Sequence, residues 1–285
     1  MEWRSSRRSE NVEDRRGVRL GPAGGIGIVG VLVALVAAYF GVDPGVISAF
    51  LSGGGGGGAP TATSGPVHET AEEAELRDFV TAVLGETEDV WRDQFARRGA
   101  SYREPTLVLF RDRVQSACGI SGSAVGPFYC PPDEQVYLDL GFFDDLRAQL
   151  GAPGDFARAY VIAHEVGHHV QKLLGISDRV HEEQRANPGR ANDLSVRLEL
   201  QADFLAGVWA HDADRMRHVL EQGDLEEALN AASRIGDDVL QRRATGHVTP
   251  DAFTHGTAAQ RVRWLRKGME SGRIEDGDTL SAKQL

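Results

Sequence analysis

The feature of this sequence that most constrains its fold is the stretch 159–171, which contains the pattern H-E-x-x-H. On an α-helix, four residues turn the chain by about 400°, so His164 and His168 lie on one face, one turn apart. Two imidazoles held in this way can bind one zinc ion from the same side. Glu165 lies at the edge of that face, where its carboxylate can reach a zinc-bound water rather than the metal. Unless the pattern is a chance match, it predicts a helix with two zinc ligands and a general base.

A second stretch, residues 197–203, lies on another segment with helical character. Its Glu199 and Asp203 are four residues apart and therefore share one helical face. A catalytic zinc site takes three protein ligands and keeps one position open, and two His plus one Glu is a common set. Glu199 is therefore predicted as the third ligand, and Asp203 as the acceptor of a hydrogen bond from the outer nitrogen of a ligand histidine. The alternative is that both carboxylates belong to a solvated helix face.

With these residues identified, the chain resembles a known family. Three segments are similar to those of the bacterial putative neutral zinc metallopeptidases: HEVGHHVQ at 164–171, ELQAD at 199–203 and FTHGTAAQR at 253–261. The resemblance covers roughly residues 70–270. It implies a zinc-dependent peptidase with Zn²⁺ as its cofactor and a peptide or protein as its substrate, without identifying that substrate.

The third segment brings in His255, which lies in a turn beside Gly256. In peptidases with this chemistry, a donor from outside the metal-binding helices often stabilises the developing oxyanion, so His255 is a second candidate catalytic residue. The alternative is a local structural role, such as capping the following helix. His169 points about 140° away from His164 around the helix. It is interpreted as a residue that packs in the protein interior or that contacts a metal ligand without binding the metal.

These residues predict the hydrolysis of peptide bonds by a water that zinc activates and that Glu165 deprotonates. Two alternatives stay open. One is an envelope protein that keeps the fold for binding or assembly without activity, which the presence of Glu165 beside intact ligands disfavours. The other is a zinc hydrolase that acts on non-peptide amides, for instance in cell-wall material.

Composition and cysteine usage narrow the class further. The formal net charge of −11 argues against nucleic acid as a partner. The two cysteines, Cys118 and Cys130, lack the C-x-x-C spacing of a zinc ribbon. A disulfide between them is predicted if the domain lies outside the reducing cytosol, and two buried thiols are the alternative.

The N-terminal region suggests a membrane anchor. Residues 1–22 are Arg-rich and are predicted as a disordered cytoplasmic tail, and the uncharged residues 23–42 are long enough for a transmembrane helix. Residues 43–68, with six consecutive glycines, read as a flexible linker. The positive-inside rule then predicts a single-pass cell-membrane protein with a cytoplasmic N-terminus and an extracytoplasmic catalytic domain. A cleaved signal peptide is the alternative.

The remaining chain predicts a zinc metallopeptidase domain over residues 69–271 and a C-terminal tail over 272–285. Helices are expected over 69–98, 142–150, 155–174, 193–210, 224–243 and 257–267, and short strands over 105–110 and 135–140. The predicted fold class is α+β, a helix-rich zincin-like domain with a small sheet, preceded by the transmembrane helix and the linker. Residues 125–140 are predicted to form the cleft rim that pairs with an extended peptide.

Overall fold

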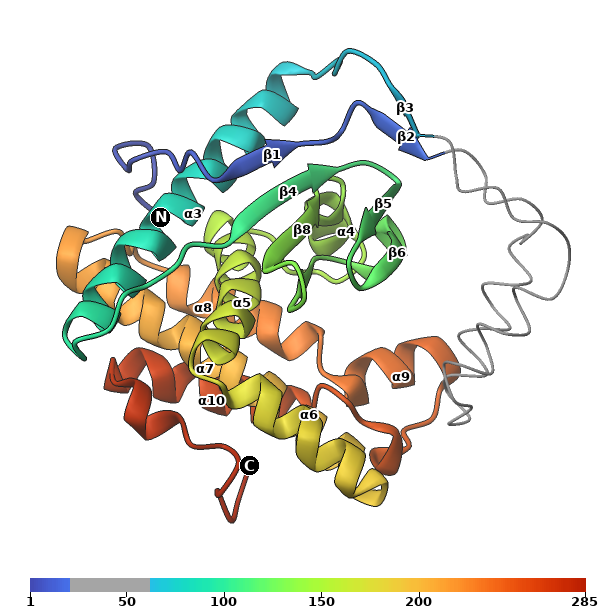
Figure 1. Ribbon diagram of the computed structural model, residues 1–285, viewed down its shortest axis with the longest axis vertical. Coiled ribbons are helices and arrows are strands. Elements are labelled where there is room, and N and C mark those ends of the chain that lie inside the picture. The colour runs from blue at the N-terminus through green and yellow to red at the C-terminus, as the bar shows by residue number, and fades with distance from the viewer. Residues whose placement is uncertain (21–61) are drawn as a thin grey trace, which may run out of the picture. The chain divides into compact units, whose positions relative to one another are not determined.

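The computed structural model describes residues 1–20 and 62–285, which belong to two compact units. The larger unit contains residues 1–15 and 68–285 (Figure 1). The smaller unit spans residues 16–67, and its described part is an antiparallel pair of strands, β2 (Val18–Leu20) and β3 (Ala62–Ser64). The predicted transmembrane segment 23–42 and most of the predicted linker lie outside the described residues.

The main sheet of the larger unit has four strands in the order β1-β4-β8-β7. Their bounds are β1 (Val12–Asp14), β4 (Thr106–Phe110), β8 (Gln135–Asp139) and β7 (Phe128–Cys130). β1, β4 and β8 are parallel, and β7 pairs antiparallel to β8 at the sheet edge. β4 and β8 correspond to the two strands predicted from sequence, and their apolar runs are buried, as expected for inner parallel strands. A separate hairpin joins β5 (Arg113–Ser116) to β6 (Gly119–Gly122).

Helices make up most of the larger unit. They are α3 (Ala71–Ala96), α4 (Phe142–Ala148), α5 (Asp155–Leu173), α6 (Ile176–Ala186), α7 (Ala191–Arg217), α8 (Asp224–Arg234), α9 (Asp237–Thr245) and α10 (Ala258–Ser271). The segment predicted as one helix over 224–243 is two helices, α8 and α9. The polar connection predicted between the two metal-bearing helices contains α6, whose buried residues are only Ser177 and Val180. Such a helix lacks the apolar stripe from which amphipathic helices are predicted in a sequence.

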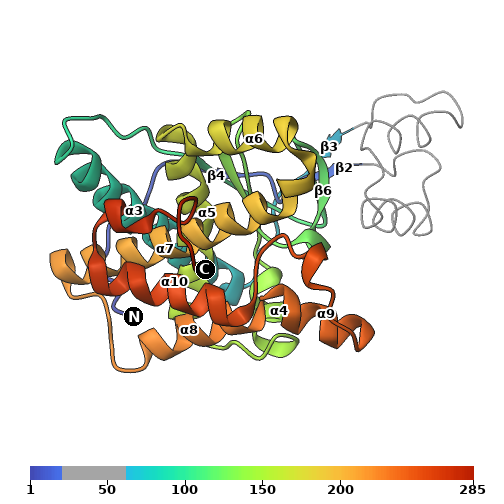
Figure 2. The same cartoon turned by 90° about the horizontal axis from the view of Figure 1, so that it is seen from below.

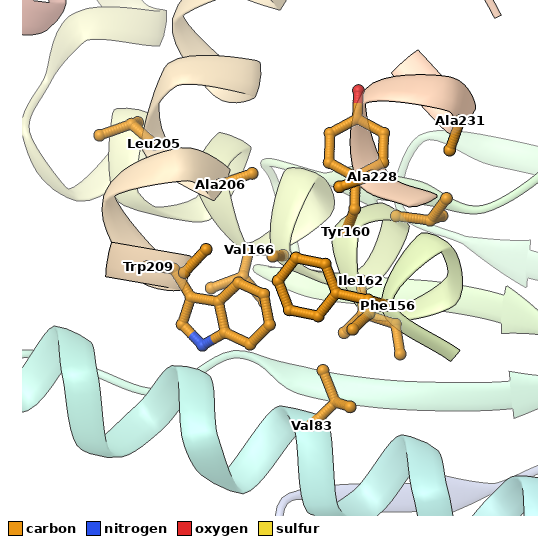
Figure 3. Close-up of a cluster of buried hydrophobic side chains, with 14 of the residues drawn as sticks. Val83, Phe156, Tyr160, Ile162, Val166, Leu205, Ala206, Trp209, Ala228 and Ala231 are labelled. Atoms are coloured by element: carbon orange, nitrogen blue, oxygen red, sulfur yellow. The ribbon is translucent and has the colours of Figure 1, made fainter. Parts of the chain in front are cut away.

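Helix α5, which carries the H-E-x-x-H pattern, is packed on several sides. The ring of its Phe156 stacks on Trp209 of α7 with centroids 5.8 Å apart, and Val83 of α3 lies beside them (Figure 3). Apolar residues of α8, among them Ala228 and Ala231, belong to the same buried cluster. Because α5 contacts α3, α7 and α8, its histidines project from a rigid support.

Glycines allow α7 to approach both of its neighbours closely. A Cβ atom on Gly167 of α5 would lie 3.0 Å from the carbonyl oxygen of Ala202 in α7. On the other side, a Cβ on Gly207 of α7 would lie 2.2 Å from the carbonyl oxygen of Leu265 in α10. The two helices α7 and α10 therefore run side by side almost in backbone contact (Figures 1 and 2). This packing brings residues of α5, α7 and α10 to one place.

Residues 1–15, expected to be part of a disordered tail, belong to the folded unit. Trp3 is buried and packs edge-on against Phe79 of α3, with ring centroids 5.3 Å apart. Arg8 forms a two-pronged salt bridge with Asp78 at 2.8 and 2.6 Å. Three of the arginines in the predicted cytoplasmic flank, Arg4, Arg7 and Arg8, thus pair with acidic residues of α3.

The predicted single-pass membrane topology is wrong, and the predicted fold class and localisation are corrected accordingly. A helix crossing once over residues 23–42 would put residues 1–22 and the catalytic domain on opposite sides of a bilayer. Residues 1–15 and 68–285 instead form one compact unit, with β1 paired to β4. Within residues 1–20 and 62–285, no helix combines the length and the apolar character needed to cross a membrane. The fold that the structure supports is helix-rich with small sheets.

Candidate active site

His164 and His168 of α5 meet Glu199 of α7 at one point. The Nε2 atoms of the two histidines are 3.2 Å apart, and the Glu199 carboxylate oxygens lie 3.2 Å from His164 Nε2 and 3.4 Å from His168 Nε2. Ligands about 2.0–2.1 Å from a tetrahedral zinc ion are themselves about 3.3 Å apart. The donor set and its spacing therefore fit Zn²⁺.

The outer nitrogen of His164 is held by a buried ion pair. His164 Nδ1 lies 2.9 Å from Asp203 Oδ1, and since a carboxylate only accepts, Nδ1–H is the donor. Arg261 of α10 donates to both Asp203 oxygens at 2.8 and 2.9 Å, and the Tyr160 hydroxyl donates to Oδ1 at 2.6 Å. Burial alone would raise the pKa of Asp203, but Arg261 and His164 outweigh it and lower that pKa to about 2. Asp203 is thus a permanent anion that turns His164 Nε2 toward Glu199.

His168 is oriented by a neutral partner on its own helix. Its Nδ1 lies 2.9 Å from the side-chain oxygen of Gln171, and the Gln171 amide nitrogen donates to the carbonyl of Leu198 at 2.7 Å. Sequence reasoning missed both Gln171 and Arg261. Each lies in a segment that carries the family resemblance, but their partners are revealed only when α5, α7 and α10 come together.

Glu165 stands beside the three ligands without joining them. Its side chain is almost fully buried, and the backbone N–H of Tyr129 in β7 donates a hydrogen bond to its carboxylate. Burial raises the pKa of Glu165 above its usual value. The carboxylate lines the same cavity as His164 and Glu199. It is placed to accept a proton inside that cavity.

His169 faces away from this cluster and connects α5 to β7. The Tyr129 hydroxyl lies 3.0 Å from His169 Nδ1, and His169 Nε2 lies 2.6 Å from the carbonyl oxygen of Arg103. Burial lowers the pKa of His169, so the neutral ring accepts from Tyr129 and donates to Arg103. This bridge holds Tyr129, and with it the N–H that Glu165 uses.

His255 lies at the wall of the cavity, paired with Asp237 at the start of α9. One Asp237 oxygen accepts from the backbone N–H groups of Thr254, His255 and Gly256 at 2.8, 2.7 and 3.1 Å. The other lies 3.3 Å from His255 Nδ1. The hydrogen bond to Asp237 raises the pKa of His255, whose side chain remains half-exposed. The sequence does not predict a role for Asp237, because its pattern predicts one continuous helix over α8 and α9.

A cavity of about 590 Å³ lies beside the three proposed ligands. It is lined by His164, Glu165, His168, Glu199 and His255, and by residues of the loop that leads into β7. Of the predicted rim 125–140, residues 125–129 and 131 border the cavity, whereas β8 lies inside the sheet. The disulfide predicted between Cys118 and Cys130 is present and closes the loop that carries this rim.

Known proteins that resemble this chain match it over a range that includes every residue of the site. The family model described as putative neutral zinc metallopeptidase matches residues 1–280, a longer range than the resemblance read from sequence. The chain is 48% identical over 285 residues to the uncharacterized protein YpfJ of Escherichia coli (strain K12), covering 95% of this chain and 96% of YpfJ. It is 41% identical over 216 residues to the uncharacterized protein Rv2575 of Mycobacterium tuberculosis, covering 72% of this chain and 71% of that protein. No solved structure matches the chain.

Proposed function

The chain belongs to the putative neutral zinc metallopeptidase family, and we propose that it is a zinc-dependent peptidase that hydrolyses peptide bonds. One observation carries the proposal. His164, His168 and Glu199 present ligand atoms 3.2–3.4 Å apart, while a fourth residue, Glu165, offers a buried carboxylate beside them without joining the set. Three ligands and a separate carboxylate are the elements that metal-assisted hydrolysis requires.

His164, His168 and Glu199 would hold the Zn²⁺ ion, whose chemistry is to polarise the scissile carbonyl and to lower the pKa of water. Glu165 takes a proton from the attacking water and passes it to the nitrogen of the leaving amine. The raised pKa of Glu165, caused by its burial, makes the carboxylate a stronger base. The backbone hydrogen bond from Tyr129 and the nearby His164 and His168 lower this pKa, but burial outweighs them.

His255 is proposed to stabilise the negative charge that develops on the carbonyl oxygen. Its Nδ1 is engaged by Asp237 and by the Thr254 hydroxyl, which leaves Nε2 as the nitrogen available to a substrate. The ion pair with Asp237 favours the protonated ring, in which Nε2 is a donor.

The free edge of β7 is proposed to hold the substrate backbone. Tyr129 directs its N–H away from β8 and toward Glu165, so in a β-strand its carbonyl faces the same side. Pro127 and Pro131 flank the strand and carry no N–H, so this edge offers mainly acceptors. An extended peptide can donate its own N–H to Tyr129, which gives affinity with little dependence on side chains.

The proposal is tested with the purified chain reconstituted with zinc at neutral pH. We expect one zinc per chain by metal analysis, and cleavage of peptide bonds in a complex peptide mixture, seen by mass spectrometry and abolished by a chelator. Glu165→Gln is the matched control, because the amide keeps the shape of the side chain. Stoichiometric zinc without cleavage would instead favour a silent binding protein, and release of products only from cell-wall amides would favour an amidohydrolase.

A further inference from the structure

A row of hydrogen bonds extends behind the proposed zinc ligand His168. Gln171, which accepts from His168 Nδ1, donates from its amide nitrogen to the carbonyl oxygen of Leu198 at 2.7 Å and to the side-chain oxygen of Gln201 at 3.1 Å. The amide nitrogen of Gln201 donates in turn to the carbonyl oxygen of Gly277 at 2.9 Å. The row therefore connects His168, through two glutamines from α5 and α7, to the backbone near the C-terminus.

Two backbone carbonyls fix the direction of this row. A carbonyl oxygen only accepts, so Gln201 turns its amide nitrogen to Gly277 and its amide oxygen to Gln171. Gln171 likewise turns its nitrogen to Leu198, which leaves its oxygen for His168. Because that oxygen also only accepts, His168 carries its proton on Nδ1 and keeps the lone pair of Nε2 for a metal ion.

Burial makes the orientation of both glutamines costly to change. Gln171 is fully buried and Gln201 almost so, and water cannot easily replace their protein partners. Leu198 accepts one amide hydrogen of Gln171 and Gln201 accepts the other. A reversed Gln201 amide would set nitrogen against nitrogen at Gln171 and oxygen against oxygen at Gly277, which leaves buried groups without partners. Gln201 thus holds Gln171 in the orientation that suits His168.

The carbonyl of Gly277 is held by the packing of the C-terminal segment, residues 274–285, against α7. A Cβ atom on Gly277 would lie 2.3 Å from the ring of Phe204, so this close approach requires glycine. Arg197 of α7 donates to the carbonyl oxygen of Thr279 at 2.7 Å, and the Thr279 hydroxyl donates back to the carbonyl oxygen of Arg197 at 2.6 Å. The far end of the row is therefore fixed to α7.

The direction of the row matters because of what the three proposed ligands present to one another. His164 and His168 both carry their protons on the outer nitrogens, which bond Asp203 and Gln171. The inward nitrogens and the Glu199 carboxylate are then all acceptors, with atoms 3.2–3.4 Å apart. Lone pairs that converge in this way repel one another until a cation lies among them. The outer hydrogen bonds thus prepare the site for a metal ion.

We propose that Gln201 is a positioning residue that acts through Gln171 on His168 and raises the affinity of the site for zinc. The inference rests on the proposed function, because it takes His168 as a zinc ligand. Gln201 itself does not line the cavity, so it acts without touching the substrate. The proposal gives the second glutamine of the row, and the C-terminal segment that holds it, a part in preparing the metal site.

The test is a double-mutant cycle that measures zinc affinity. Gln171→Met, Gln201→Met and the double variant of the full chain are titrated with Zn²⁺ against a competing chelator, since Met keeps the length of Gln without its amide. Gln171→Met should raise the Kd for zinc by about 10–100-fold, and Gln201→Met by about tenfold. Because Gln201 acts through Gln171, adding Gln201→Met to Gln171→Met should change the Kd by less than about twofold.

The cycle separates this inference from the proposed function. An unchanged Kd in Gln201→Met, or an equal loss in both backgrounds, overturns the positioning role while zinc binding by the wild-type chain leaves the metal site standing. A wild-type chain that binds no zinc overturns both.

Two further variants separate orientation from packing. Gln201→Glu keeps an oxygen that accepts from Gln171, so its Kd should stay within about threefold of the wild-type value. A loss of about tenfold in Gln201→Glu overturns the inference whether or not Gln201→Met folds, which melting temperatures show. Gln184→Met is the matched control, because Gln184 of α6 also donates to a backbone carbonyl, that of Ala191 at 3.0 Å, and to a side-chain oxygen, that of Ser195 at 2.9 Å. Its Kd should be unchanged, and a loss equal to that of Gln201→Met would contradict a specific role for Gln201.

Discussion

Arg261 and Asp203 form a fully buried, two-pronged salt bridge directly behind His164. Their atoms are 2.8 and 2.9 Å apart, and Asp203 in turn lies 2.9 Å from His164 Nδ1. Two chain segments that are 58 residues apart in sequence thus act on one imidazole. The pair keeps the tautomer of His164 in which Nε2 is free for the metal.

Breaking this pair should weaken the metal site in two distinguishable ways. Asp203→Asn should lower zinc affinity by roughly 10–100-fold, because the amide orients His164 less firmly. Arg261→Met should also destabilise the protein by about 3–5 kcal/mol, because it leaves the Asp203 charge buried without its partner. Zinc titration against a competing chelator and urea unfolding measure the two effects. Arg263→Met, two residues away on the exposed face of α10, is the control and should change neither.

The proposed role of His255 predicts a loss of turnover without a loss of zinc. His255→Ala should reduce kcat by about 10²–10³-fold, the usual effect of removing an oxyanion donor. Because Asp237 raises the pKa of His255, Asp237→Asn should also move the alkaline limb of the pH profile to lower pH. His247→Ala serves as the control, because His247 is also an exposed histidine but does not line the cavity. A His255→Ala enzyme with full activity would leave His255 only a structural role.

The packing of the N-terminal segment predicts that it contributes to the stability of the catalytic unit. Trp3→Ala should lower the free energy of unfolding by about 3–5 kcal/mol, since the indole is buried against Phe79. Arg4→Ala, at an exposed neighbouring position, should have little effect. Denaturant unfolding of both variants checks this, and equal stabilities would mean that residues 1–15 are not part of the fold.

Removal of the disulfide should affect the cavity rim without affecting the metal site. Replacing Cys118 and Cys130 together by Ala should cost about 2–3 kcal/mol of stability and raise KM, because the loop bearing Val125 loses its closure. Zinc content should stay at one per chain, since the ligands lie on α5 and α7. Loss of zinc in the double variant would show that the loop supports the metal site itself.

Local spacing explains what could be predicted from sequence. The positions of His164, His168, Glu199 and Asp203 follow from helical periodicity, because each pair lies four residues apart on one helix. Gln171 also lies on α5, but its role depends on Leu198 across the α5–α7 contact. No periodicity connects residues whose partners become neighbours only when helices pack.

The same dependence on periodic patterns explains why the predictions for residues 1–15 and for the segment of α6 are wrong. Residues 1–15 are predicted as part of a disordered tail because they are Arg-rich and show no periodic pattern of apolar residues. In the structure, however, Arg8 pairs with Asp78 of α3, far along the chain. Helix α6 was missed because it is polar on nearly every face and buries little. The family resemblance supplied what spacing did not, since it pointed to the segment that contains His255 and Arg261.

The central claim is that Glu165 acts on protons while Glu199 holds the metal, and Gln substitutions at the two positions test it most directly. The measurement is zinc content after dialysis together with peptidase activity. Glu165→Gln should keep its zinc and its melting temperature but lose about 10²–10⁴-fold in activity, because only the base is removed. Glu199→Gln should lose zinc on dialysis and, with it, the stability that metal binding adds. Loss of zinc from Glu165→Gln with retention by Glu199→Gln would reverse the two roles, and full zinc and activity in both would place the active site elsewhere.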